Sequence, residues 1–148
     1  MKAKSGFTLV EILIVVVILG ILAAIVIPQF TEASTEAKTS SLCTDLQTMR
    51  SQIELYKIQH NDALPGSGTA TLVEALTGQT DIDGAVWAAG TTAYGPYVQQ
   101  IPTNQFNDRK TIREEAGAST AGADTDGWVF NTGTGAFQAD DSAEHAAL

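Results

Sequence analysis

Residues 7–27 read FTLVEILIVVVILGILAAIVI, and the only charged side chain in this run is Glu11. At about 1.5 Å of rise per residue, a helix of this length measures roughly 31 Å, which is enough to cross the hydrocarbon core of a bilayer. Lys2 and Lys4 stand upstream, on the side that basic residues keep in the cytoplasm. The run therefore predicts one membrane-spanning helix with the rest of the chain exported behind it.

Glu11 is an unusual residue for such a helix. A carboxylate in the middle of a lipid-facing helix costs about 2.5–3.5 kcal/mol, so one that is kept there usually has a partner. The alternative is a side chain that extends to the lipid headgroups, and Glu11 lies close enough to the helix end for that. The charge by itself leaves both interpretations open.

Residues 6–11, Gly-Phe-Thr-Leu-Val-Glu, resemble the processing signature of type IV prepilins and pseudopilins. The resemblance implies that a prepilin peptidase cuts after Gly6 and that Phe7 becomes the N-methylated first residue. It also implies that Glu11 pairs with the cationic amine of Phe7 on a neighbouring subunit during assembly. Two charges in an apolar environment are tolerable only as a pair, so this pairing would favour the correct register.

A secretory signal peptide is the alternative interpretation of the N-terminus. The apolar run is longer than the h-region of such a peptide. The nearest small-residue cut site, Ala23-Ala24, lies inside the run rather than after it. A cut after Ala24 would end the prepilin interpretation.

Length, charge and cysteine content bound the remaining possibilities. A chain of 148 residues fits one domain plus an anchor. The net charge of −9 becomes −11 if a leader with Lys2 and Lys4 is removed, which argues against nucleic acid as a partner. Cys43 is the only cysteine, so no disulfide can form within the chain.

Gly20 and Pro28 interrupt an otherwise strong helical pattern, because glycine weakens a helix interior and proline removes one backbone hydrogen bond. In pilin-like proteins, a glycine and a proline at these places bracket a section that can lose helical structure inside the filament. The resemblance therefore implies an extensible section between Gly20 and Pro28.

The helix is expected to continue beyond Pro28 to about residue 59. Apolar residues recur there with the spacing of one helix face, on which a globular domain can pack. They are Leu42, Leu46, Met49, Ile53 and Tyr56.

The rest of the chain predicts an α+β fold, with the long helix packed against a small three-stranded antiparallel sheet. Residues 110–113 read as a short strand, and residues 127–139 read as a β-hairpin. The expected parts are a leader at 1–6, a transmembrane and assembly helix at 7–27, its amphipathic half at 28–60, a connecting region at 61–104, the sheet at 105–139 and a flexible acidic tail at 140–148.

Residues 95–107 form a second motif, in which two prolines fix the chain and Tyr97, Ile101 and Phe106 supply apolar contacts. This Gly-Pro-Tyr...Ile-Pro...Asn segment is similar to the one that precedes the sheet in the major pseudopilins of type II secretion systems. The similarity favours a pseudopilin over other pilin-like proteins.

Calcium is the one cofactor that the resemblance raises, because major pseudopilins often bind it in the loop around the sheet. Asp81-Ile82-Asp83-Gly84 and Asp124-Thr125-Asp126-Gly127 resemble the opening of a calcium loop, but neither has the glutamate that closes an EF-hand loop. We expect ordinary acidic turns and no cofactor. If a calcium ion is bound, Asp124 and Asp126 are the first candidates.

No catalytic constellation stands out, since the chain lacks the common nucleophile, nucleotide and zinc motifs. We therefore expect a structural subunit rather than an enzyme. It would form a homopolymer, a periplasmic pseudopilus that drives type II protein secretion. It would be a single-pass protein of the bacterial inner membrane with its globular domain in the periplasm.

The expected partners are the prepilin peptidase, the inner-membrane assembly platform and minor pseudopilins. Two alternatives stay open. One is a type IV pilin of a surface pilus used for adhesion, twitching or DNA uptake. The other is a membrane-anchored ligand-binding or enzymatic domain.

Overall fold

The computed structural model describes residues 6–90 and 92–148 of the chain. The predicted leader, residues 1–6, lies outside the described residues except for Gly6. The chain divides into two compact units, residues 1–39 and residues 40–148.

Helix α1 spans Leu9–Gln59 and contains Pro28 in its interior. Its first part is apolar and long enough to cross a membrane, and none of that stretch is buried within the chain. The long N-terminal helix predicted from the sequence is confirmed. Pro28 does not end the helix, and three residues later the Thr31 hydroxyl donates a hydrogen bond to the carbonyl of Ile27 at 3.1 Å.

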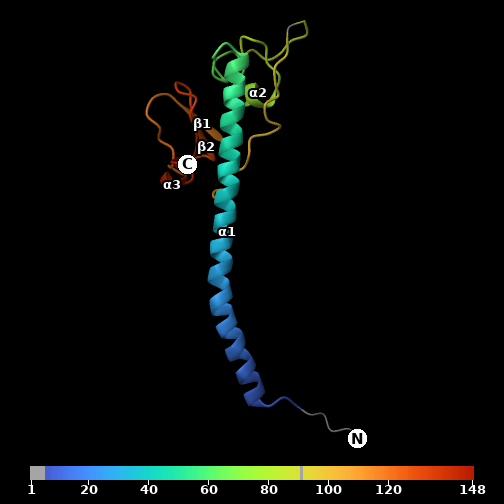
Figure 1. The fold of residues 1–148 in the computed structure, drawn as a ribbon, viewed down its shortest axis with the longest axis vertical. Coiled ribbons are helices and arrows are strands. Elements are labelled where there is room, and N and C mark those ends of the chain that lie inside the picture. Colours follow the sequence, from blue (N-terminus) through green and yellow to red (C-terminus); the bar gives the residue numbers. More distant parts are fainter. Residues whose placement is uncertain (1–5, 91) are drawn as a thin grey trace. The chain divides into compact units, whose positions relative to one another are not determined.

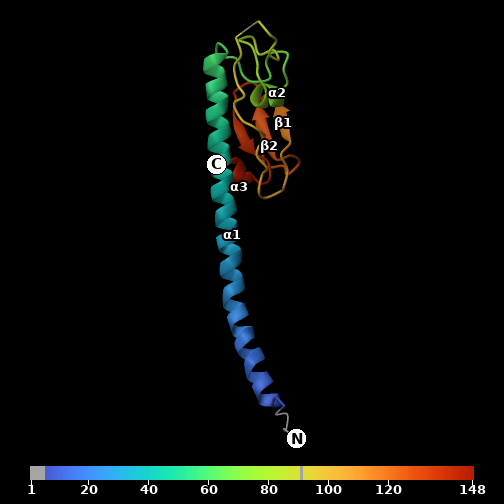
Figure 2. The same ribbon diagram turned by 90° about the vertical axis from the view of Figure 1, so that its right-hand side faces the viewer.

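The second unit is built on the last five turns of α1. All five residues of the predicted apolar face are buried there, which confirms the packing face. Figures 1 and 2 show the sheet and α2 beside this part of the helix. The core joins the helix face to side chains from α2, from the loop that precedes the sheet and from the sheet itself. They are Leu72, Leu76, Ile101, Trp128, Phe130, Phe137 and Ala139.

Helix α2 spans Leu72–Thr77 and begins with a capping box. Glu74 N donates to the Thr71 hydroxyl at 3.3 Å, and Thr71 N donates to the Glu74 carboxylate at 2.9 Å. The end of α2 holds the proline-containing loop, because Tyr97 N and Val98 N both donate to the carbonyl of Leu76, at 2.9 and 3.0 Å. The loop is thus ordered and packed on the core, as its apolar residues predict.

The sheet consists of β1 (Ile112–Glu115), β2 (Trp128–Asn131) and β3 (Phe137–Ala139), in that order. β2 and β3 form the predicted antiparallel hairpin, with Phe130 opposite Phe137. β2 is buried along its whole length, as suits a central strand.

The prediction of a fully antiparallel sheet is wrong, because β1 pairs with β2 in parallel, with Ile112 opposite Trp128. Parallel strands need a connection of about a dozen residues or more to bring the chain back to the same end of the sheet. Residues 116–127 supply it, and both Gly127 N and Trp128 N donate to the carbonyl of Thr111 at 3.1 Å. The sheet is therefore mixed.

The acidic tail, expected from sequence to fray, has a defined conformation in part. Its first residue, Asp140, is fully buried, and helix α3 follows at Ala143–Ala146. Arg50 links the last residue of the tail to β3, since its Nη1 donates to a Leu148 oxygen and its Nε to the carbonyl of Phe137, each at 3.0 Å. The tail differs from the sequence expectation because its first acid, Asp140, accepts hydrogen bonds from backbone N–H groups instead of water.

We predict that Leu46→Ala lowers the free energy of unfolding by about 2–5 kcal/mol, because it leaves a cavity under the sheet. Ile58→Ala is the matched control on the same helix, at a side chain that is 77% exposed, and should change it by less than about 0.5 kcal/mol. Chemical unfolding of the full chain in detergent, followed by tryptophan fluorescence, measures both, since Trp128 is fully buried in this core. Equal losses would contradict the assignment of the packing face.

Candidate functional site

Glu11 lies in the first turn of α1, where it forms a capping box with Thr8. Thr8 precedes the first helical residue, Leu9. The Thr8 backbone N–H and hydroxyl both donate to Glu11 Oε2 at 2.8 Å, and Glu11 N donates back to the Thr8 hydroxyl at 3.2 Å. The Glu11 carboxylate therefore satisfies the Thr8 N–H and the Thr8 hydroxyl satisfies the Glu11 N–H, two donors that have no partner inside the helix. Sequence reasoning gave Glu11 a partner on another chain and missed this local one, although the Thr-x-x-Glu spacing signals it.

The apolar surface around Glu11 is exposed along the whole first part of α1. Phe7 is 84% exposed, and every large apolar side chain from Val10 to Ile27 is at least half exposed. A Cβ added at Gly20 would meet no atom within 4 Å, so the surface is open there too. Continuous apolar surface of this kind marks an interface with lipid or with other chains. The structure brings Phe7 and Glu11 to one end of the surface and places Gly20 and Pro28 along it.

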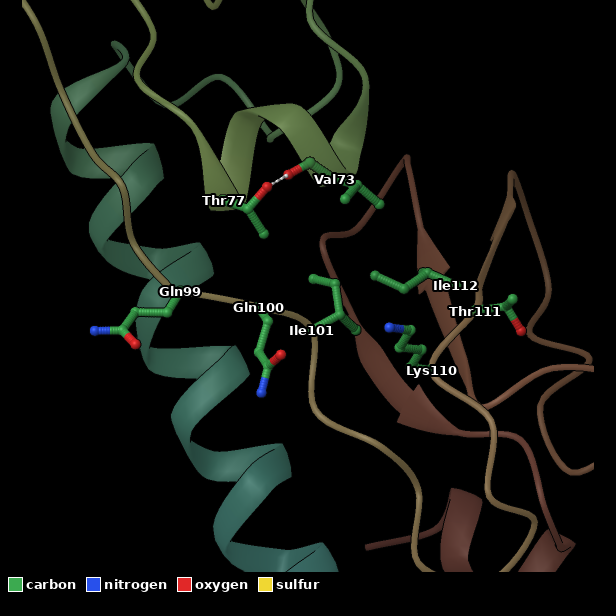
Figure 3. A pocket seen from close by; sticks show the side chains of 8 residues that line it. All are labelled: Val73, Thr77, Gln99, Gln100, Ile101, Lys110, Thr111 and Ile112. Atoms are coloured by element: carbon green, nitrogen blue, oxygen red, sulfur yellow. Dashed lines mark hydrogen bonds between the residues drawn. The ribbon is translucent and has the colours of Figure 1, made fainter.

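One pocket of the second unit lies between α2, the loop before the sheet and β1 (Figure 3). It is an open hollow of about 520 Å³. Its lining is mostly apolar or amide, and Lys110 is its only charged side chain.

The two histidines act as structural residues. His60 is buried with its ring stacked on Tyr56 at 3.7 Å between centroids, and its Nε2 lies 2.9 Å from the Thr80 hydroxyl. His145 bonds through Nδ1 to Asp141, and its ring lies 4.1 Å from that of Phe106. Both ring nitrogens of His60 and Nδ1 of His145 thus make hydrogen bonds within the fold.

The two calcium candidates lie in the connection between β1 and β2, and both face arginines. Asp124 Oδ1 accepts from Asn107 Nδ2 at 3.0 Å and from Arg109 Nη1 at 3.1 Å. Asp126 Oδ2 lies 3.6 Å from Arg113 Nε. The sequence placed these carboxylates in one loop correctly but did not reveal their cationic neighbours.

Asp140, which the sequence analysis left in the tail, is the centre of this loop. Burial raises the pKa of Asp140, but hydrogen bonds from the N–H groups of Asp126, Ala123 and Thr125 outweigh it, and the pKa lies below the ordinary value. Glu115 is held similarly. Hydrogen bonds from Thr120 lower its pKa more than its desolvation raises it. The only sequence signal for the burial of Asp140 is its position directly after β3, whose Phe137 and Ala139 are buried.

Comparison with known proteins finds a motif match in the N-terminal segment. Residues 1–27 match the model of the prokaryotic N-terminal methylation motif. This confirms the resemblance that residues 6–11 predict.

The chain is also similar to type II secretion system core protein G from several bacteria. It is 42% identical to that of Pseudomonas aeruginosa over 79 residues, which is 52% of this chain and 55% of the relative. It is 34% identical to that of Escherichia coli K12 over 75 residues, 50% of this chain and 52% of the relative. With the protein of Klebsiella pneumoniae the identity is 29% over 108 residues, 72% of this chain and 71% of the relative.

The chain thus spans about half the length of most of these curated relatives. No solved structure matches it significantly.

We predict that the loop makes the fold sensitive to acid. Asp140 and Glu115 bind protons more weakly in the folded than in the unfolded chain, so their stabilisation is complete above the unfolded pKa of about 4 and is lost as the pH falls through the lower folded pKa. Glu115→Gln should therefore flatten the fall in melting temperature between about pH 5 and pH 3. Glu114→Gln, at the exposed position of the same strand, should leave the slope unchanged, and equal effects of both variants would contradict the assignment.

Proposed function

We propose that this chain is the major pseudopilin of a type II secretion system. It polymerises through α1 into a periplasmic filament that drives protein secretion. The observation that carries the proposal is the exposed apolar surface of α1 with one carboxylate, Glu11, in its first turn. The methylation motif at residues 1–27 and the similarity to type II secretion system core protein G support it.

Processing creates the partner that Glu11 needs. Cleavage between Gly6 and Phe7 leaves a methylated, cationic amine on Phe7, two residues before α1 begins. That amine and the Glu11 carboxylate lie at the same end of an apolar surface. Each charge is costly there alone, and each is tolerated when it meets the opposite charge of the neighbouring subunit.

The capping box is compatible with this pairing. Within the described residues, both hydrogen bonds to the Glu11 carboxylate come from Thr8 and end on Oε2. Oε1 can therefore accept the amine of a neighbouring Phe7 while Oε2 keeps its contacts with Thr8. The box also fixes the Glu11 rotamer before the subunit meets its neighbour.

The section from Gly20 to Pro28 is the part of α1 that loses helical structure in the filament. Pro28 has no N–H, so it gives no hydrogen bond to the carbonyl of Ala24. Glycine adds the largest loss of helix propensity among residues other than proline. The section therefore costs less to unwind than its neighbours when subunits stack.

The partners follow from this assembly. The prepilin peptidase processes the chain, an inner-membrane assembly platform adds subunits, and minor pseudopilins complete the filament. The chain is held in the bacterial inner membrane by a single span, with residues 40–148 in the periplasm. The work comes from a separate cytoplasmic ATPase.

We predict that mass spectrometry of the mature chain finds an N-methylated Phe7 as its first residue. The cut is expected after Gly6 because that glycine opens the signature at residues 6–11, which lies inside the matched motif. Gly6→Asp should leave the precursor uncut in the membrane. A mature chain that begins at residue 25, after Ala24, would contradict the proposal.

We predict that Glu11→Ala inserts into the membrane normally but lowers filament yield at least about tenfold, because the amine of the neighbouring Phe7 loses its counter-charge. Glu32→Ala is the matched control, since Glu32 lies on the same helix outside the apolar run. Sheared or overexpressed filaments, quantified by immunoblot and electron microscopy, measure the effect. Normal filaments from Glu11→Ala would contradict the charge pairing.

Two further observations, on a deletion strain and on fibres sheared from wild-type cells, distinguish a secretion pseudopilus from a surface pilus. Loss of an exported enzyme from the medium after deletion of the gene supports a secretion pseudopilus. Long fibres sheared from wild-type cells, together with unimpaired secretion in the deletion strain, would assign the chain to a surface pilus instead.

A further inference from the structure

The connection between β1 and β2, residues 116–127, wraps around a buried carboxylate. This is the loop around the sheet in which the resemblance implies calcium, and it contains the candidates Asp124 and Asp126. Whether calcium fits depends on which oxygens are free to bind it, since calcium takes six to eight oxygen ligands.

Asp140 is the most enclosed carboxylate of the loop, and both of its oxygens are saturated with donors. Oδ1 accepts from Gly122 N at 3.0 Å, from Ala123 N at 3.1 Å and from Arg113 Nη2 at 2.8 Å. Oδ2 accepts from Thr125 N at 3.1 Å, from the Thr125 hydroxyl at 3.0 Å and from Asp126 N at 2.9 Å. A carboxylate offers about four lone-pair sites, and six donors already point at this one. Asp140 therefore has no lone pair left for a metal ion.

The other oxygens of the loop surround the guanidinium group of Arg113, where a calcium ion would otherwise have to lie. Its Nη1 donates to Glu115 Oε2 at 3.3 Å and to the Thr120 hydroxyl, and its Nη2 donates to the Thr120 carbonyl at 3.3 Å. Its Nε lies 3.6 Å from Asp126 Oδ2. One guanidinium thus faces three carboxylates, those of Glu115, Asp126 and Asp140.

The remaining candidate carboxylate, Asp124, is also compensated. Arg109 Nη1 donates to its Oδ1 and to its backbone carbonyl. Among the residues that the structure describes, no three His, Cys, Asp or Glu side chains are grouped to hold a metal ion. The oxygen atoms of the loop are therefore arranged to accept hydrogen bonds from guanidinium groups, and they do not fit calcium.

We infer that the Arg113 guanidinium supplies the positive charge that closes the 116–127 loop on Asp140, and that this loop folds without a divalent cation. The inference does not depend on the proposed secretion function. It makes the stability of the second unit independent of calcium in the surrounding medium, and it makes Arg113 the residue on which the parallel connection of the sheet depends.

Thermal unfolding of the full chain in detergent tests both halves of the inference. The wild-type chain is melted in EGTA, in 1 mM CaCl2 and in 1 mM MgCl2. The expected melting temperatures agree, or shift equally in the two salts by screening of the chain's net negative charge. A rise in CaCl2 that MgCl2 does not reproduce would overturn the inference, as would saturable calcium binding in a calorimetric titration.

Arg113→Gln tests the guanidinium itself. Removing the counter-charge of a buried carboxylate is strongly destabilising, so the melting temperature should fall by at least about 5 °C in every buffer, and calcium should not restore it. Lys110→Gln, an exposed cation just before the same strand, is the matched control and should shift it by less than about 2 °C. Equal melting temperatures for the two variants would overturn the inference.

If Arg113→Gln does not fold, Arg113→Lys replaces it. Lysine keeps the charge but lacks the planar fork that reaches three carboxylates, so an intermediate melting temperature is expected. A wild-type melting temperature for Arg113→Lys in EGTA would show that the fork is not needed and would overturn the assigned role.

Discussion

A carboxylate in the first turn of an apolar helix is the constraint on which this molecule depends. The first part of α1 has no core of its own, and its side chains are exposed over its whole length. Such a surface marks an interface with lipid or with other chains. In the proposed filament, Glu11 would make assembly selective, because only a subunit that brings a positive charge to the position of the carboxylate would offset the cost of burying it. The capping box with Thr8 holds that carboxylate in a defined position.

The second unit solves a different problem, which is to fold without a disulfide. Its core is built on one face of α1 and on the fully buried strand β2. A long connection is needed to place β1 parallel to β2, and long connections are hard to order. The buried Asp140 carboxylate orders this one by accepting hydrogen bonds from backbone N–H groups of the loop and from the partly exposed Arg113. The hydrogen bonds and charges around Asp140 thus restrain this connection in the way that a disulfide restrains a loop in other small domains.

Much of this architecture follows from local sequence patterns. The spacing of Leu42, Leu46 and Met49 fixes the packing face of α1, since only a helix brings them to one side. The hairpin follows from the short turn between residues 131 and 137. These features depend on neighbours in sequence, so periodicity and turn chemistry report them.

The features that the sequence did not reveal depend on distant residues. The direction of β1 is set by where a twelve-residue connection returns, and nothing within Ile112–Glu115 encodes that. Asp140 looks like one acid among several in a tail, and its burial becomes visible only when Arg113, 27 positions away, lies beside it. At the N-terminus, the sequence predicts a partner for Glu11 on another chain, which stays a prediction. The structure shows a contact that the sequence prediction did not include, between Glu11 and Thr8 of the same chain, and the Thr-x-x-Glu spacing signals it.

The most direct measurement of the central claim is a structure of the assembled filament at a resolution that shows side chains. The account predicts that the Glu11 carboxylate of one subunit lies within about 3.2 Å of the Phe7 amine of the next, with Thr8 still capping the helix. A filament in which Glu11 contacts only its own Thr8, while the neighbouring amine lies against lipid or another acid, would contradict it.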